Sequence, residues 1–166
     1  PIWKTEETVA FIENLLTTIS DVAKFSVAGS FRRTKETSKD LDFIVATDEP
    51  AKVKEQLLAG LPVKETIASG DTKVSVAVEV VEPIDVDFRL VAPEEFATAL
   101  HHFTGSKDHN VRMRQLAKAK KEKISEYGVE QEDGSVLTFE TEEAFFAHFN
   151  LPFILPTVRE NGREID

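Results

Sequence analysis

The 166-residue chain contains no cysteine. This absence excludes a disulfide scaffold, a zinc cluster built on cysteines and a catalytic thiol. The chain also lacks any apolar run near the roughly 20 residues that a membrane-spanning helix needs, and its N-terminus lacks the pattern of a secretory signal. We therefore expect a soluble, cytoplasmic protein that works as a monomer and has no membrane partner.

Basic residues are in the minority, with 20 lysines and arginines against 30 acids and a formal net charge of -10. Such a balance argues against indiscriminate nucleic-acid binding, because phosphates are held mainly by lysine and arginine. Residues 107–123 reverse this balance, since Asp108 and Glu122 are their only acids. The basic residues of this segment are Lys107, Arg112, Arg114, Lys118, Lys120, Lys121 and Lys123.

The first part of the chain alternates helical and strand-like patterns. Apolar residues at helical spacing predict a helix over 5–20, with Thr5 as its N-cap. A second helix is predicted over 48–60, opened by an Asp48 cap and an early proline. The expected strands are 24–28, 41–47, 63–68, 73–81 and 84–91, of which the third and fourth form a hairpin.

Pro93 marks an expected domain boundary. Beyond it the patterns predict helices over 94–103 and 107–120, a small hairpin around "EDGS" and a short helix at "EEAFFAHF". Strands interleaved with helices are typical of an α+β sheet domain with a helical layer. The expected organisation is therefore an α+β domain at 1–92 and a smaller, mainly helical domain at 93–166.

Asp40 and Asp42 are separated by a single residue at the start of a predicted strand. Side chains at i and i+2 share a face, so two like charges stand side by side, which costs free energy unless a positive group lies between them. Mg²⁺ takes oxygen ligands and often uses one or two carboxylates with substrate phosphates. A solvent-facing strand end is the equal alternative on this spacing alone.

A Gly29-Ser30 turn precedes these acids and changes that balance. Its backbone N–H groups and hydroxyl suit phosphate oxygens, and Arg32 and Arg33 add positive charge beside them. A phosphate site joined to a metal site is typical of phosphoryl or nucleotidyl transfer. A third carboxylate is expected from strand 84–91, and its spacing leaves Asp85 and Asp87 as equal candidates.

Together these motifs resemble the nucleotidyltransferase core and thumb of the family X DNA polymerases, and most closely their bacterial branch. The resemblance extends from about residue 5 to about residue 160. It implies a mixed-sheet palm of the nucleotidyltransferase type at 1–92 and a mainly helical thumb with a short hairpin at 93–166. The matching motifs are Gly29-Ser30-Phe31-Arg32-Arg33, Asp40-Leu41-Asp42, Val86-Asp87-Phe88, Phe103-Thr104-Gly105-Ser106 with Asn110 and Arg114, and "ISEYGV" at 124–129.

The resemblance also implies residue roles. Asp40 and Asp42 match ligands of two Mg²⁺ ions, for which Mn²⁺ can substitute, and Asp87 rather than Asp85 matches the ligand of the catalytic ion. The implied nucleotide-binding residues are Gly29, Ser30, Arg33, Ser38, Phe103, Thr104, Gly105 and Asn110. The expected DNA-binding residues are Lys73, Arg112, Arg114 and Lys118.

The predicted activity is addition of a deoxynucleotide from dNTP to a DNA 3′ hydroxyl in short-gap DNA repair, on gapped or primer-template DNA. Two alternatives stay open: a small-molecule nucleotidyltransferase, and a catalytically weak DNA-binding module. The second arises because the family's helical N-terminal part, which grips DNA, is not in this chain, which we expect to be a piece of a longer polypeptide. His102 and Lys107 depart from the pattern of animal members, and they concern sugar discrimination and nucleotide affinity.

Two further groups are expected to be structural. His101, His102 and His109 lack a carboxylate at ligand spacing, so surface or interface histidines are favoured over a metal cluster. The phenylalanines of "EEAFFAHF" have helical spacing, which favours a small core over base stacking.

Overall fold

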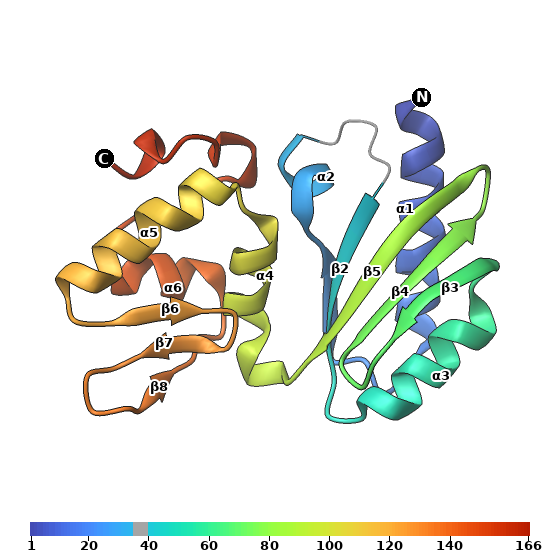
Figure 1. Cartoon of the computed structure of the whole chain (residues 1–166), viewed down its shortest axis with the longest axis horizontal. Coiled ribbons are helices and arrows are strands. Elements are labelled where there is room, and N and C mark those ends of the chain that lie inside the picture. The colour runs from blue at the N-terminus through green and yellow to red at the C-terminus, as the bar shows by residue number, and fades with distance from the viewer. Residues whose placement is uncertain (35–39) are drawn as a thin grey trace. The chain divides into compact units, whose positions relative to one another are not determined.

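The computed structural model describes residues 1–34 and 40–166 (Figure 1). The chain divides into two compact units. The first consists of residues 1–31 and 35–93, of which 35–39 are not described, and the second of residues 32–34 and 94–166. The short helix α2 (Gly29–Thr34) therefore contributes residues to both units.

The first unit contains a five-stranded mixed sheet. Its strand order is β1-β2-β5-β4-β3, in which only the central pair β2 and β5 is parallel. Helices α1 (Ile2–Thr18) and α3 (Pro50–Gly60) share one apolar core with the sheet. The strands are β1 (Lys24–Val27), β2 (Asp40–Ala46), β3 (Val63–Ser69), β4 (Lys73–Glu79) and β5 (Pro83–Val91).

Strict alternation along β5 places its apolar and polar side chains on opposite faces. Ile84, Val86, Phe88 and Leu90 are buried in the core shared with α1 and α3. Asp85, Asp87 and Arg89 consequently point to the other face of the sheet. Phe43 of β2 stacks on Phe88 with ring centroids 5.7 Å apart, which anchors the two central strands to each other.

Both predicted helix caps of this unit were wrong. Helix α1 begins at Ile2, so Thr5 lies buried inside the helix. Helix α3 begins at Pro50, and Asp48 does not cap it; Thr47 Oγ1 instead accepts a hydrogen bond of 2.9 Å from the Glu49 N–H. A proline at the first helical position lacks an N–H, which removes one of the donors that a cap would satisfy.

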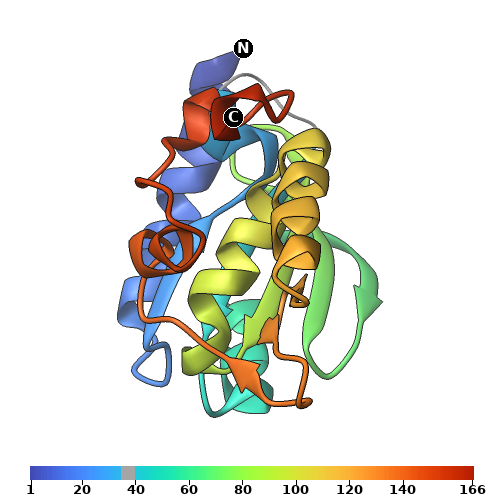
Figure 2. The same ribbon diagram turned by 90° about the vertical axis from the view of Figure 1, so that its left-hand side faces the viewer.

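The second unit is mainly helical. After a short 3-10 turn, η1 (Pro93–Glu95), come α4 (Phe96–Thr104) and α5 (Lys107–Ala119), which Figure 2 shows from the side of this unit. Ser106 caps α5 by accepting from the His109 N–H at 3.2 Å. The remaining elements are β6 (Lys123–Ser125), β7 (Gly128–Glu130), β8 (Val136–Leu137), α6 (Glu142–His148), η2 (Pro156–Val158) and η3 (Arg163–Ile165).

The small antiparallel sheet β6-β7-β8 contains the predicted hairpin plus one strand that was not predicted. Strand β6 is three residues long, too short for an alternating pattern to stand out. Phe145, Phe146 and Phe149 are buried in the core of this unit, which confirms their structural interpretation. The α+β fold class predicted from the sequence is confirmed.

Across the described residues, no helix combines the length and apolar character that crossing a bilayer requires.

Candidate active site

Four carboxylates gather on the sheet face opposite α1 and α3. In the parallel register of β2 and β5, Asp40 pairs with Asp85 and Asp42 pairs with Asp87. Alternation then directs all four to the same face. Asp40 and Asp85 are exposed, whereas Asp42 and Asp87 are half-buried. The inner pair is therefore the better-formed part of the site, and Asp85 lies at its exposed edge.

The pKa of Asp42 reflects its burial and the charges around it. Burial raises the pKa of Asp42 above its ordinary value, and the nearby charges of Asp87 and Asp40 raise it further. Arg89 and Lys73 act in the opposite direction but do not cancel these effects. A cation bound beside Asp42 would relieve both the burial and the repulsion.

Asp87 is oriented by a serine that the sequence did not single out. Ser75 of β4 lies opposite Asp87 in the antiparallel β4–β5 register. Its hydroxyl donates a 2.6 Å hydrogen bond to Asp87 Oδ1. The contact follows from the register of the β4–β5 pair, which neither strand reveals by itself in the sequence.

Gly29 brings the backbone against the carboxylate of Asp42. Its φ is +64°, a conformation that side chains with a Cβ rarely adopt, and a Cβ at this position would lie 2.8 Å from Asp42 Oδ2. The Ala28 N–H also donates to the Asp42 carbonyl at 2.8 Å. The predicted Gly-Ser segment is thus the first turn of α2, and it begins beside the Asp-Leu-Asp motif. Ser38, a further predicted phosphate ligand, lies outside the described residues.

The donor set suits a hard divalent cation. Carboxylate oxygens are the ligands that Mg²⁺ prefers, and the pKa of Asp42 is raised first by burial and then by the charges of Asp87 and Asp40. Within residues 1–34 and 40–166, however, no three acidic, histidine or cysteine side chains converge as a complete metal shell. Mg²⁺ commonly completes its coordination with water and substrate phosphates, so an open set of this kind fits it.

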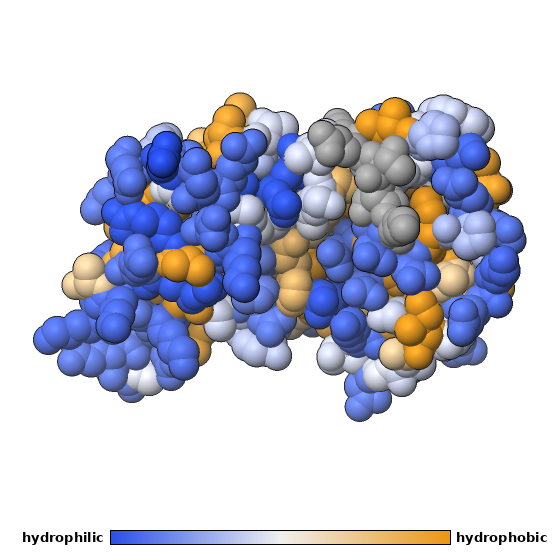
Figure 3. Space-filling model, turned by 45° about the horizontal axis from the view of Figure 1, so that its top comes forward, coloured by the Kyte–Doolittle hydropathy of each residue, from blue (hydrophilic) through white to orange (hydrophobic). Residues whose placement is uncertain are grey.

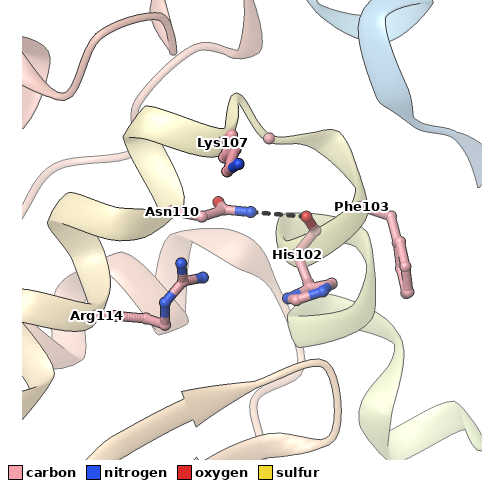
Figure 4. A pocket seen from close by; sticks show the side chains of 6 residues that line it. His102, Phe103, Lys107, Asn110 and Arg114 are labelled. Carbon is pink, nitrogen blue, oxygen red and sulfur yellow. Dashed lines mark hydrogen bonds between the residues drawn. The ribbon is translucent and has the colours of Figure 1, made fainter.

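In the second unit, a hollow of about 310 Å³ lies between α4 and α5 (Figure 4). Asn110 donates from Nδ2 to the His102 carbonyl at 2.8 Å, which joins the two helices at the hollow. Asn110 Oδ1 is buried and has no hydrogen-bond partner within the described part of the chain. The lining residues are His102, Phe103, Gly105, Lys107, Asn110 and Arg114.

Helix α5 presents a polar and basic face beside this hollow. Lys107, Asn110, Arg114 and Lys118 follow one another at helical spacing, beside the buried Met113 and Ala117. In Figure 3 the visible surface of the second unit, in the left half of the view, is mostly hydrophilic. Of the other predicted DNA-binding residues, Arg112 forms a 2.8 Å ion pair with Asp166, and Lys73 is exposed at the start of β4 in the first unit.

The two arginines of α2 make ordered contacts within the second unit. Arg33 donates from Nη1 to the Thr104 carbonyl at 2.5 Å. A Cβ at Gly105, whose φ is +72°, would lie 3.0 Å from the same nitrogen, so glycine leaves room for this contact. Arg32 donates to Thr104 Oγ1 at 2.9 Å and grips Glu142 with both terminal nitrogens.

Glu142 completes a buried ion network that the sequence did not indicate. Arg159, also buried, donates to Glu142 Oε2 at 3.0 Å, so this carboxylate lies between two guanidinium groups. Burial alone would raise the pKa of Glu142, but hydrogen bonds and positive charge from Arg32 and Arg159 lower it below its ordinary value. The network holds the end of α2, α6 and the segment around Arg159 together.

The expectation of surface histidines was wrong for His101 and His109, which are both buried. Their Nε2 atoms lie 2.9 Å apart, and His109 Nδ1 lies 3.0 Å from Glu164 Oε1. Burial lowers the pKa of each imidazole, for His101 well below its ordinary value, so both are neutral at pH 7. Glu164 is 55 residues from His109, and local spacing gives no sign of such a partner.

Comparisons with known proteins match both units. Residues 1–78 match the family model described as DNA polymerase beta palm, and residues 99–160 match the one described as DNA polymerase beta thumb. A DNA polymerase/3'-5' exonuclease named PolX, from Bacillus subtilis (strain 168), is 57% identical over 156 residues. The match covers 93% of this chain and 27% of that relative, so the chain spans about a quarter of the relative's length.

Proposed function

We propose that this chain adds a deoxynucleotide from dNTP to a DNA 3′ hydroxyl in short-gap repair. The chain belongs to the family X DNA polymerases and carries their palm and thumb. The observation that carries the proposal is the pairing of Asp42 with Asp87 on two parallel strands, beside the close approach of Gly29. This arrangement joins a metal-type carboxylate set to a phosphate-type turn. We expect the chain to act as a monomer in the cytoplasm.

In this proposal Asp40, Asp42 and Asp87 would hold two Mg²⁺ ions, for which Mn²⁺ could substitute, and Asp87 would hold only the catalytic one. When bound, the ions lower the pKa of the attacking hydroxyl and neutralise charge on the phosphates. Asp87 accepts the proton of the 3′ hydroxyl, while Ser75 holds its Oδ1 in place. The 3′ oxygen bonds to the α-phosphorus, and the bond to the β-phosphate breaks to release pyrophosphate.

The nucleotide's phosphates would be bound by Gly29, Ser30, Arg33 and, outside the described residues, Ser38. Arg33 spends Nη1 on the Thr104 carbonyl, and a guanidinium has further N–H donors for a phosphate. Phe103, Thr104 and Gly105 would lie against the sugar. Asn110 would contact the base in the minor groove, because its amide nitrogen carries a second hydrogen besides the one given to His102.

DNA would be held mainly through its phosphates. Arg114 would contact the template strand, and Arg112, Lys118 and Lys73 would contact the backbone. This local basic surface reconciles DNA binding with a net charge of -10. Lys107 adds a cation beside the hollow, and we expect it to strengthen binding of the anionic nucleotide.

The test is primer extension on gapped DNA with Mg²⁺. Asp87→Ala should abolish extension, whereas Asp85→Ala, a change on the same strand and face, should retain it. Asp85 is the matched control because it is exposed and lies two residues from Asp87 along the same strand, opposite Asp40 rather than Asp42. Absence of extension by the unmodified chain at high protein concentration and low salt would contradict the proposal for this chain.

The same preparation separates the two alternatives. Nucleotide transfer to a small acceptor without DNA would identify a small-molecule nucleotidyltransferase, for which Asn110 and the basic face of α5 have no evident use. DNA binding without any transfer would identify a binding module. The second result has a structural basis, because the chain spans only 27% of its PolX relative, and the remaining parts can contribute to holding DNA.

A further inference from the structure

Two buried histidines and a partly buried glutamate in the second unit take no part in the proposed chemistry. They are His101 of α4, His109 of α5 and Glu164 of η3, and we call them the His–Glu relay. Glu164 Oε1 lies 3.0 Å from His109 Nδ1, and His109 Nε2 lies 2.9 Å from His101 Nε2. Three elements that are distant in the sequence are thus joined by two consecutive hydrogen bonds.

The chemistry of the groups gives this relay a direction. An ionised carboxylate only accepts hydrogen bonds, so His109 must donate from Nδ1 to Glu164. A neutral imidazole that donates from Nδ1 must accept at Nε2, so His101 donates from its own Nε2. The Glu160 N–H also donates to Glu164 Oε1 at 3.1 Å, as expected for a carboxylate.

The surrounding charges favour the neutral form of both imidazoles. Arg159, Arg32 and the neighbouring His102 disfavour a positive charge on His101. Around His109, Arg159 acts in the same direction, and the acids Glu164 and Glu142 oppose it. Burial prevails at both sites, which keeps one proton on each ring and preserves the direction of the relay.

The relay and the hydrogen bond at the hollow join the same two helices. His101 bonds His109 in the interior, and the next residues, His102 and Asn110, bond each other at the hollow. Both bonds link α4 to α5 across a separation of eight residues. The inner bond therefore contributes to holding α4 and α5 at the separation at which Asn110 meets the His102 carbonyl.

We infer that Glu164 is a positioning residue for the Asn110 contact, and that it acts through the tautomer of His109. This inference rests on the proposed function, because it assigns Asn110 the recognition of the incoming nucleotide. A lost acceptor at residue 164 lets His109 carry its proton on Nε2, where it faces the N–H of His101. While His101 keeps its own proton on Nε2, two N–H groups face each other, so the helices lose their inner bond and the Asn110 amide loses its fixed place.

Several contacts hold the segment that contains Glu164 against α5. Its segment follows residue 160, where the match to the thumb family model ends, and it lies along α5 in Figure 1. Ser106 Oγ donates to the Glu160 carbonyl, and Ile165 is buried in the same core as Met113. At Gly162, with a φ of +88°, a Cβ would lie 3.0 Å from Arg112 Cβ, so the backbone approaches α5 closely.

The test is NMR of the whole chain labelled with ¹⁵N. We expect imidazole spectra of the unmodified protein to show His109 protonated on Nδ1 and His101 protonated on Nε2. Glu164→Ala should abolish the single His109 tautomer, shift the Asn110 side-chain amide signals and speed their hydrogen exchange. Glu164→Gln should restore most of both, because its amide oxygen still accepts from Nδ1. Asp166→Asn is the matched control, a charge removal in the same segment that should leave both signals in place.

Kinetics add a second readout. Glu164→Ala should raise the KM for dNTP up to roughly tenfold, the scale of one net hydrogen bond, with kcat nearly unchanged. If the unmodified chain does not extend primers, the proposed function fails, while the two NMR signals still decide the relay. An unchanged His109 tautomer in Glu164→Ala would overturn the inference. So would a changed tautomer with unchanged Asn110 signals, because Asn110 would then be positioned by other contacts.

Discussion

The two units treat buried charge in opposite ways. In the second unit, Glu142 lies between Arg32 and Arg159, and its pKa is lowered. In the first unit, Asp42 lies near two further aspartates, and its pKa is raised despite the nearby Arg89 and Lys73. The fold stabilises the ionised form of Glu142, whereas the surroundings of Asp42 disfavour its ionised form.

The difference distinguishes a structural charge from a functional one. Burying an ion is costly unless it is paired and hydrogen-bonded, and the network of Glu142 meets this condition within the chain. Asp42 is half-buried beside Asp40 and Asp87, and its pKa stays raised despite Arg89 and Lys73, so the proposed metal ion would offset part of the cost of its charge. This contrast supports the proposal that the active site lies on the first unit's sheet rather than at the larger ion network.

Substitution of Asp42 is expected to have the largest effect on activity. We expect Asp42→Asn to lower primer extension on the order of a thousandfold, because metal stabilisation is worth several kcal/mol and each 1.36 kcal/mol is tenfold. The thermal midpoint at pH 7.5 should stay equal or rise, because the raised pKa means that the folded state disfavours the charge. Steady-state kinetics and a thermal melt measure the two effects. Lost activity accompanied by lost stability would contradict a purely functional charge.

Glu142 should give the reverse pattern. Glu142→Ala leaves the buried guanidinium of Arg159 and the partly buried one of Arg32 without their carboxylate, and we expect it to lower the free energy of unfolding by about 3–5 kcal/mol. Glu143→Ala, at the exposed next position of α6, should change it by less than about 0.5 kcal/mol. Urea denaturation measures both, and equal effects of the two substitutions would show that the network is not a stabilising unit.

Magnesium should distinguish the two units in a third way. Binding at the aspartates should raise the stability of the first unit by about 1.4 kcal/mol at a tenfold excess over Kd. Trp3, the only tryptophan, lies in α1 of that unit, and its fluorescence reports the melt. Asp42→Asn should abolish the shift, and Glu143→Ala should retain it. A magnesium effect that survives in Asp42→Asn would place the ion elsewhere.

The smallest effect concerns His101 and His109. The unfolded chain protonates these imidazoles near their ordinary pKa of 6.5, whereas burial lowers both pKa values in the folded state. Their contribution to stability is therefore complete above that pH and declines as the pH falls below it. Hydrogen exchange of α5 amides at pH 7.5 and 5.5 measures the decline. The double substitution His101→Leu with His109→Phe should flatten it, and an equally steep decline would assign it to other groups.

Local pattern decided which side chains share a face. The spacing of Asp40 and Asp42 and the alternation of 84–91 were sufficient to predict an acidic sheet face, because strand geometry has a period of two. The helix over 107–119 followed in the same way from its polar and apolar spacing. The choice of Asp87 over Asp85 had come from the family resemblance, and the parallel register now sets Asp87 beside Asp42.

Tertiary structure alone decided which distant charges meet. Nothing near Glu142 in the sequence indicates Arg32 or Arg159, and nothing near His109 indicates Glu164. Such contacts depend on how helices and the terminal segment pack, and packing is set by the sum of many apolar contacts rather than by any local period. For this protein, the sequence by itself determined the acidic face and the basic helix. The fold decided which distant ions meet inside the chain, because this depends on how its elements pack.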